Sequence, residues 1–294
     1  MNRGARHDST SRPTVTIGMP VFNGERYIRQ AIDSVRAQTF EDFEFLISDN
    51  ASTDATAAIC REYAEKDRRI RLIRQEQNLG PFGNFKFVTD QASGDLLVWL
   101  AHDDVLEARF VEQTRLFMEQ NPNAVLVCAD VRVIDERGTE TGIEELCGIR
   151  EWIDWPRRCA EFFKFPISNV YLAIYGMMRT DVCRAALNAV RPPKYMAQIE
   201  LPILARFAAA GEIASIPRVL RSYRRHDASL YHSEVSAMAR KPPFKLPVSR
   251  WLHVGRLIFD QISLLLAACV RGRVKFAVLR NVANHYASRL VREL

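Results

Sequence analysis

Two adjacent aspartates, Asp103 and Asp104, end the apolar run VWLAHDDV (98–105). Neighbouring carboxylates repel each other, so their place at the end of a predicted strand implies a positive partner. Carboxylate oxygens suit Mg²⁺ or Mn²⁺, and such ions keep coordination positions open for diphosphate oxygens. The pair is therefore expected to hold a divalent cation that binds a diphosphate. The alternative is that one aspartate caps a helix that begins near Glu107.

Other polar residues also follow predicted strands, at Asn23, at Asp49-Asn50 and at Asn78. Asn23 is also expected to cap the helix after the first strand, and Ser52 or Thr53 the helix after the second. Hydrophobic periodicity predicts strands over 14–22, 43–48, 70–75, 96–100 and 124–134, and helices over 25–38, 57–66, 84–92 and 107–119. This alternation predicts an α/β fold with a mostly parallel sheet, whose ligands bind beyond the carboxyl ends of the strands.

The sequence lacks the motifs of several common binding sites and the features of a secreted or membrane-spanning protein. The chain has no GxxxxGK[ST] and no GxGxxG after its first strand, so neither a P-loop nor a dinucleotide site is expected. Its six cysteines are scattered without zinc-like spacing, which favours reduced thiols in a cytoplasmic protein. No apolar run is long enough to span a membrane, and residues 1–13 are polar, as in a disordered tail and unlike a secretory signal.

One long segment carries a family resemblance: IGMPVFNGERYIRQAIDSVRAQTFEDFEFLISDNASTDAT resembles the start of the inverting family 2 glycosyltransferases. The resemblance continues through NLGPFGNF, the aspartate pair, IELPILARFAAAGEI and YRRHDAS, and it covers roughly residues 14–230. It implies a GT-A fold, related to the Rossmann fold, and a nucleotide-diphosphate sugar as donor. Each motif is weak alone, but the combination is specific.

The resemblance assigns a nucleotide site to the first two strands. Pro20 and Phe22 match positions that line the base pocket, where an aromatic ring can pack against a pyrimidine. Asp49 matches the aspartate that accepts a hydrogen bond from the base, which suits the N3–H of uracil and favours a UDP-sugar. Asn23 and Asn78 match positions near the nucleotide. For Asp49 the structural alternative is an Asx turn beside Asn50.

The metal motif departs from the common family pattern. Many relatives have Asp-x-Asp-Asp, whereas this chain has Ala101-His102-Asp103-Asp104. The resemblance implies that Asp103 faces the ribose or the metal and that Asp104 binds Mn²⁺ or Mg²⁺. His102 is an additional candidate ligand, since alternation along the strand does not fix its direction.

The catalytic base is expected at the start of a later helix. In relatives an aspartate opens a helix that ends in Arg-x₄-Gly, and aligning Arg206 and Gly211 places Glu200 on that aspartate. A glutamate there can remove the proton from an acceptor hydroxyl. The structural alternative is a first-turn glutamate that interacts with the helix dipole.

Two basic residues, Arg224 and His226, lie in the motif YRRHDAS. The resemblance favours them as contacts for the leaving diphosphate, whose charge they would stabilise. The structural alternative is a basic surface cluster.

Four segments are expected: a disordered tail (1–13), a nucleotide-sugar-binding half (14–134), an acceptor-binding half of the same domain (135–230) and a helical extension (231–294). In the acceptor half, Trp152, Trp155 and Tyr171 are candidates for stacking on a sugar or lining a lipid cleft, with core packing as the alternative.

The helical extension is basic and amphipathic. Residues 240–294 carry a net charge of +9, which exceeds the +6 of the whole chain. This segment suits an anionic membrane surface, packing on the catalytic domain, or packing on a second copy in a homodimer. It contains no recognisable nucleic-acid-binding motif, so no nucleic-acid partner is expected.

Together these features predict an inverting, metal-assisted glycosyltransferase. It would transfer a sugar from a nucleotide-diphosphate sugar to a hydroxyl of a growing cell-surface glycan or lipid-linked acceptor. The expected location is the cytoplasm, with peripheral contact at the inner face of the membrane. Two alternatives stay open: a nucleotidyltransferase on a related fold, and a non-catalytic nucleotide-sugar-binding scaffold, which the loss of the first aspartate at Ala101 keeps in play.

Overall fold

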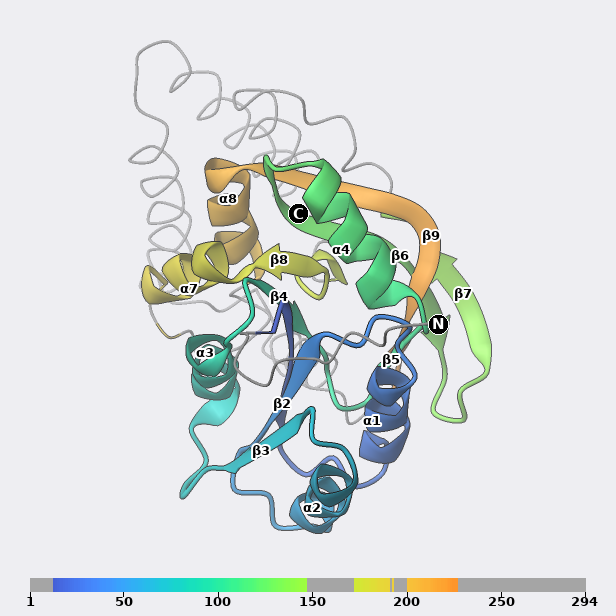
Figure 1. The fold of residues 1–294 in the computed structure, drawn as a ribbon. Coiled ribbons are helices and arrows are strands. Elements are labelled where there is room, and N and C mark those ends of the chain that lie inside the picture. The colour runs from blue at the N-terminus through green and yellow to red at the C-terminus, as the bar shows by residue number, and fades with distance from the viewer. Residues whose placement is uncertain (1–12, 147–171, 191, 193–199, 227–294) are drawn as a thin grey trace, which may run out of the picture.

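The computed structural model describes residues 13–146, 172–190, 192 and 200–226, which form a nine-stranded sheet with helices on both faces (Figure 1). The predicted tail, all but Pro13, and the whole helical extension lie outside the described residues. So do Trp152, Trp155 and Tyr171. The predicted division into four segments therefore stays a prediction.

The first half of the chain alternates strands and helices as its hydrophobic pattern predicts. The elements are β1 (Val15–Val21), α1 (Ile28–Arg36), β2 (Phe43–Asp49), α2 (Thr56–Lys66), β3 (Ile70–Arg74), α3 (Gly80–Gln91), β4 (Leu96–Trp99), β5 (Val105–Leu106), α4 (Phe110–Gln120) and β6 (Ala124–Ile134). Every residue of β1 is buried, as expected for a central strand covered on both faces. The predicted strands and helices of this half are confirmed, with shifts of a few residues at their ends.

The second half contributes β7 (Glu140–Glu144), β8 (Met177–Arg179), α7 (Thr180–Asn188), α8 (Glu200–Ala210) and β9 (Glu212–Arg224). The 13-residue strand β9 contains the start of the YRRHDAS motif. The periodicity of the sequence did not predict β9 as one long strand, because its burial pattern is irregular and its end contains buried charged residues.

The sheet is a mixture of parallel and antiparallel pairs in the order β3-β2-β1-β4-β8-β6-β9-β5, with β7 paired to β6. The four strands β3, β2, β1 and β4 are parallel, as predicted. The short strand β8 lies antiparallel between β4 and β6. The carboxyl ends of the parallel strands thus meet at one edge, and β8 widens the sheet beside that edge.

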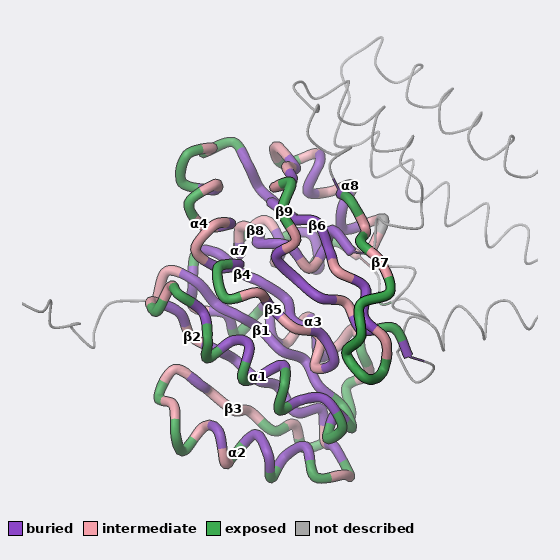
Figure 2. The backbone as a smooth tube through the Cα atoms, turned by 90° about the vertical axis from the view of Figure 1, so that its right-hand side faces the viewer, coloured by how far each residue is buried: buried purple, intermediate pink, exposed green. Residues whose placement is uncertain are grey.

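Each face of the sheet has its own hydrophobic cluster. One cluster joins the sheet to α3, α7 and α8 through residues such as Val88, Leu187 and Phe207. The other joins it to α1, α2 and α4 through residues such as Ile32, Cys60 and Phe110. The central strands are buried along their length, whereas the outer faces of the helices are exposed (Figure 2). The architecture is a three-layer α/β/α arrangement of the GT-A type.

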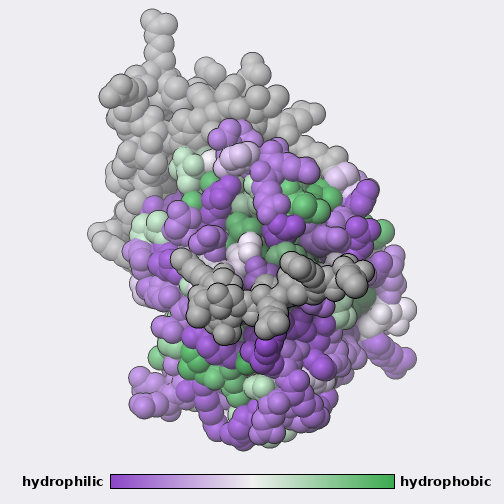
Figure 3. Space-filling view, viewed as in Figure 1, coloured by the Kyte–Doolittle hydropathy of each residue, from purple (hydrophilic) through white to green (hydrophobic). Residues whose placement is uncertain are grey.

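The visible surface is mostly hydrophilic, with small groups of hydrophobic residues (Figure 3). Cys60, Cys128 and Cys183 are free and buried, and burial raises the pKa of each thiol to about 12. These three thiols therefore stay protonated at neutral pH. Within the described ranges, no helix is long and apolar enough to cross a membrane.

Candidate active site

The aspartate pair lies in the turn between β4 and β5, next to strand β9. Strand β5 pairs antiparallel with β9, so that Val105 faces Ser222 and Leu106 faces Arg221. This pairing brings Asp104 against residues that follow it by more than 100 positions in the chain. The alternative in which one aspartate caps a helix is not supported, because α4 begins at Phe110 without a side-chain cap.

Asp104 is buried and both of its carboxylate oxygens are engaged by β9. Arg221 Nη1 donates to Oδ2 at 3.1 Å, and the backbone N–H of Arg224 donates to Oδ1 at 3.0 Å. Burial raises the pKa of Asp104 to about 7, with Arg221 opposing that shift and Asp103 adding to it. Asp104 thus has Arg221 as a positive partner within the protein, and its predicted role as a metal ligand stays a prediction.

Asp103 lies beside Asp104 and pairs with His226. His226 Nε2 lies 2.8 Å from Asp103 Oδ2, and both side chains are largely buried. Burial by itself would raise the pKa of Asp103, but the hydrogen bond with His226 and the charges of His102 and His226 hold it below its usual value. Asp103 is therefore the ionised member of the pair. The predicted contact of His226 with a leaving diphosphate stays a prediction.

Arg224 is almost fully buried, and each of its side-chain nitrogens is held by the protein. Its Nε donates to the carbonyl oxygen of Asp103 at 3.0 Å, Nη1 to that of Asp135 at 3.1 Å, and Nη2 to Gln30 Oε1 at 2.7 Å. Its guanidinium lies 4.6 Å from the ring centroid of Tyr27. Arg224 thus fixes the turn that carries Asp103, and its predicted contact with a leaving diphosphate stays a prediction.

The residues predicted for the base pocket lie where β1 and β2 end. Asp49 is fully buried, and its Oδ1 accepts a hydrogen bond from Ser52 N at 3.0 Å. Its Oδ2 is also buried and accepts no hydrogen bond from the described residues, with Arg74 Nε as an ion-pair partner 3.4 Å away. Phe22 is 43% exposed just past β1, whereas Pro20 is buried within that strand. One oxygen of Asp49 thus closes the Asx turn, and the other is an acceptor without a hydrogen-bond donor among the described residues.

The asparagines of this edge shape its loops. Asn23 has a positive φ of 52°, and its Oδ1 accepts from Thr53 N at 2.9 Å, so it does not cap α1 as predicted. Asn50 Nδ2 donates to Asn78 Oδ1 at 2.9 Å, and Asn50 Oδ1 accepts from Leu79 N at 2.8 Å. Neither Ser52 nor Thr53 caps α2; the N–H of Thr56 is bonded by Asp54. Contact of Asn23 or Asn78 with a nucleotide stays a prediction.

Glu200 is the first residue of α8 and is partly buried, as the motif alignment predicts for the start of this helix. Its charge acts on Tyr175, which the charges of Asp104, Asp103 and Arg221 also reach. Tyr175 lies near the aspartate pair, because its ring packs on the guanidinium of Arg221, which donates to Asp104. Residues far apart in the sequence are brought together in this way.

Arg221 and Tyr175 were not among the residues predicted for the site. Arg221 looked like part of a basic cluster in the sequence, although a buried arginine in a strand needs an acid partner. Tyr175 precedes β8 in a stretch without any motif. Only the pairing of β8 and β9 with the sheet reveals either residue.

A mostly parallel α/β sheet with a buried carboxylate at the end of β2 and an aspartate pair after β4 is the arrangement expected of a nucleotide-sugar transferase. The family model of Glycosyl transferase family 2 matches residues 16–185. The chain therefore belongs to glycosyl transferase family 2 and is a glycosyltransferase. This membership sets aside the nucleotidyltransferase and scaffold alternatives.

Two curated relatives are similar over most of the chain, and a third is similar over one third of it. An uncharacterized glycosyltransferase of Haemophilus influenzae is 23% identical over 242 residues, which cover 78% of this chain and 72% of that protein. An uncharacterized protein of Mycobacterium tuberculosis is 31% identical over 72% of this chain, which spans 59% of the relative's length. The glycosyltransferase GlyA of Streptococcus pneumoniae is 36% identical over 98 residues, 33% of this chain and 14% of that protein.

Solved structures with low sequence identity share the fold. TarS 1-349 of S. aureus in complex with UDP-GlcNAc aligns with a TM-score of 0.67 and 18% identity, over 94% of this chain and 73% of that one. The mannosyltransferase PcManGT of Pyrobaculum calidifontis, in complex with GDP-Man and Mn²⁺, aligns with a TM-score of 0.54 and 17% identity, over 94% of this chain and 81% of that one. These likenesses support the GT-A fold.

The first prediction concerns the buried position of Arg224. Arg224→Met is expected to destabilise the protein by about 3–5 kcal/mol, because it leaves buried carbonyl oxygens without a donor. Urea unfolding followed by circular dichroism measures the change. Arg225→Met is the matched control: Arg225 is half exposed and 3.9 Å from Glu144, so its removal is expected to change stability by less than about 0.5 kcal/mol. Equal losses in the two variants would contradict a structural role specific to Arg224.

Proposed function

We propose that the chain transfers a sugar from a UDP-sugar to an acceptor hydroxyl in one step, with inversion at the anomeric carbon. The observation that carries this proposal is the buried oxygen Asp49 Oδ2 at the end of β2, which accepts no hydrogen bond from the described residues. A single displacement needs a base on one side of the sugar and a diphosphate site on the other. The acceptor class, a cell-surface glycan or a lipid-linked sugar, rests on the family resemblance alone.

The uracil ring is proposed to bind at Asp49. A buried acceptor oxygen without a hydrogen-bond donor costs free energy unless a ligand supplies that donor, and Asp49 Oδ2 is such an atom among the described residues. The N3–H of uracil is a donor of the right kind. The exposed ring of Phe22, next to the end of β1, supplies an apolar face for the base.

A divalent cation fits this site with a single carboxylate as its protein ligand. The described residues contain no group of three or more His, Cys, Asp or Glu side chains that could hold a metal ion. Mg²⁺ sites of nucleotide enzymes use one or two carboxylates together with phosphate oxygens, so a full protein cage is not required. Asp103, the ionised member of the pair, would hold the cation, and His226 would orient its carboxylate.

In the proposed reaction, Glu200 accepts the proton of the acceptor hydroxyl while the hydroxyl oxygen forms its bond to the anomeric carbon. The bond from that carbon to the diphosphate breaks at the same time, and UDP leaves with its electron pair. Mn²⁺ or Mg²⁺ bound at Asp103 supplies positive charge for the diphosphate. No side chain forms a covalent bond to the sugar.

The base-recognition proposal is tested with Asp49→Asn. An asparagine can place its single oxygen toward Ser52 N or toward uracil, but not both, so UDP affinity is expected to fall on the order of tenfold or more. Calorimetry with UDP and with N3-methyl-UDP, each with Mn²⁺, measures this. Wild type should bind the methylated nucleotide weakly, and the variant should no longer distinguish the two.

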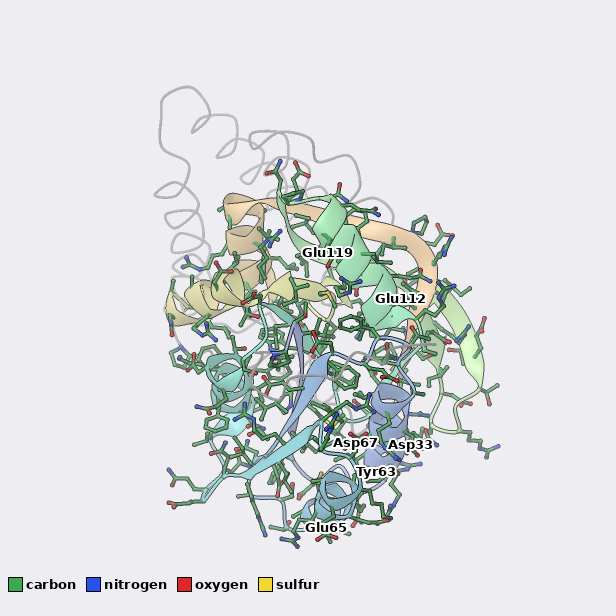
Figure 4. The ribbon with its side chains drawn as sticks, viewed as in Figure 1. Asp33, Tyr63, Glu65, Asp67, Glu112 and Glu119 are labelled. Atoms are coloured by element: carbon green, nitrogen blue, oxygen red, sulfur yellow. The ribbon has the colours of Figure 1, made fainter. Side chains whose placement is uncertain are left out.

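Asp33→Asn on α1 is the matched control, because Asp33 lies with Tyr63 and Asp67 where α1 meets α2 (Figure 4). The affinities of the Asp33→Asn protein for UDP and for N3-methyl-UDP should equal those of wild type. An Asp49→Asn protein that keeps both the UDP affinity and the preference over N3-methyl-UDP would contradict the assignment of Asp49.

The cation proposal is tested by comparing the two aspartates. In Asp103→Asn, UDP binding should lose most of its dependence on Mn²⁺, because the ionised ligand is gone. Asp104→Asn should keep that dependence and instead lower stability, because it removes the charge that pairs with Arg221. Calorimetry with and without Mn²⁺ and urea unfolding are measured for both. Reversed results would return the metal role to Asp104.

The base is tested with Glu200→Gln. The amide cannot accept the proton, so turnover is expected to fall by about 10²–10⁴-fold, while UDP binding stays unchanged. UDP release is measured with UDP-sugars and glycan or lipid-linked acceptors that wild type uses. Glu119→Gln, an exposed change on α4, is the control and should be fully active (Figure 4). Wild-type turnover in Glu200→Gln would exclude Glu200 as the base.

A further inference from the structure

Tyr27 lies just before α1 and is buried beside the turn that carries the aspartate pair. Its backbone N–H donates to Gly24 O at 3.1 Å, and the residue is 7% exposed. Its hydroxyl oxygen is buried and has no hydrogen-bond partner among the described residues. Within the described ranges, the polar groups around this side chain are therefore met by its aromatic ring.

Two of the residues that contact the Tyr27 ring also hold Asp103. The ring of His226 lies 5.1 Å away, centroid to centroid, at an interplanar angle of 50°, and the guanidinium of Arg224 lies 4.6 Å from the Tyr27 centroid. His226 Nε2 lies 2.8 Å from Asp103 Oδ2, and Arg224 Nε donates to the carbonyl oxygen of Asp103 at 3.0 Å. Tyr27 thus packs on one group that holds the carboxylate of Asp103 and on another that holds its backbone.

The Tyr27 ring also lies where three elements meet. The guanidinium of Arg26, in the turn before α1, lies 4.9 Å from the ring centroid and pairs with Glu136, after β6, at 2.7 Å. Arg224, at the end of β9, donates to Gln30 on α1 at 2.7 Å. The attraction between a cation and an aromatic ring strengthens as water is excluded. Arg26 is 62% exposed, whereas Arg224 is almost fully buried, so the contact of the ring with Arg224 is the stronger one.

The imidazole of His226 needs a neighbour that limits its motion. Its Nε2 is paired with Asp103, whereas its Nδ1 is buried and has no hydrogen-bond partner among the described residues. A single hydrogen bond leaves the plane of a ring free to rotate about the line between the two bonded atoms. The tilted contact with the Tyr27 ring lies within the usual range of aromatic pairs, and it restricts that rotation.

We propose that Tyr27 is a positioning residue, whose ring holds His226 and Arg224 so that the Asp103 carboxylate keeps one direction. The inference rests on the proposed function, in which Asp103 holds Mn²⁺ or Mg²⁺ beside the diphosphate. Groups that orient a metal ligand through a second contact raise the affinity for the metal without touching it. Tyr27 lies one contact further out, behind both His226 and Arg224. Its ring, and not its hydroxyl, carries this role.

The test measures how far UDP binding depends on Mn²⁺ when the ring is removed and when it is kept. Calorimetry with UDP, with and without Mn²⁺, is done on wild type, Tyr27→Leu and Tyr27→Phe. In Tyr27→Leu, the gain in UDP affinity on adding Mn²⁺ is expected to fall by about tenfold, while the affinity without Mn²⁺ stays as in wild type. Tyr27→Phe is expected to restore the gain, because the hydroxyl has no hydrogen-bond partner among the described residues.

Tyr63→Leu is the matched control. Tyr63 on α2 is 8% exposed, and its ring also lies near two guanidinium groups, that of Arg29 at 5.8 Å and that of Arg36 at 5.5 Å (Figure 4). Its loss should lower stability in urea unfolding, as the loss of Tyr27 does, but leave the gain from Mn²⁺ unchanged. If Tyr27→Leu does not fold, Tyr27→Met takes its place, because a flexible methionine fills more of the volume of the ring.

Four results would overturn the inference. They are a full gain from Mn²⁺ in Tyr27→Leu, an equal loss of UDP affinity with and without Mn²⁺, the same loss of the gain in Tyr63→Leu, and a Tyr27→Phe protein that does not restore the gain. Asp103→Asn, measured in parallel, separates this inference from the proposed function. If Asp103→Asn removes the gain while Tyr27→Leu keeps it, only the positioning role fails. If wild type shows no gain, or Asp103→Asn keeps it in full, the cation proposal fails and the positioning role fails with it.

Discussion

The buried contact between Asp104 and strand β9 is the constraint on which the site depends. One carboxylate accepts from the Arg221 side chain and from the Arg224 backbone, and it thereby ties the end of β4 to β9 across 117 residues of sequence. Removing one partner of such a pair leaves a buried charge without compensation, at a cost of about 3–5 kcal/mol. The same two segments are also joined by the short pairing of β5 with β9 and by the hydrogen bond from Arg224 Nε to the carbonyl oxygen of Asp103.

The contact also explains how two carboxylates can stand side by side. Asp104 is paired with Arg221 inside the protein, and the hydrogen bond between Asp103 and His226 favours the ionised form of Asp103. A pair in which both members faced solvent would repel a diphosphate twice. When one carboxylate of the pair is bound by an arginine of the protein, only the other carboxylate contributes a negative charge at the surface of the site. The usual first aspartate of the family motif is replaced by Ala101 in this chain. A hard cation can still bind through one carboxylate together with phosphate oxygens.

The antiparallel strand β8 extends the site beyond a simple parallel sheet. By entering between β4 and β6 it places Tyr175 beside the aspartate turn, and Gly176 lets it approach β6 closely. Glu200 begins helix α8, which packs on the same face of the sheet as α3 and α7. The donor half of the site is thus built by the regular parallel strands, and the half where the sugar is proposed to react is built by the irregular elements that follow.

The sequence by itself determined the local elements and the class of protein. Continuous apolar strands, amphipathic helices and polar residues at strand ends predict a parallel α/β sheet, because each signal lies within a few neighbouring residues. The motifs around Asp49, the aspartate pair and Glu200 indicate the family for the same reason. Only the tertiary structure decided what the charged residues do. Whether Asp104 or Asp103 is free to meet a ligand, whether Arg224 points to a substrate or into the core, and whether Tyr175 reaches the site all depend on strands β8 and β9. Their partners lie far along the chain, and sequence spacing carries no signal for such distant pairings.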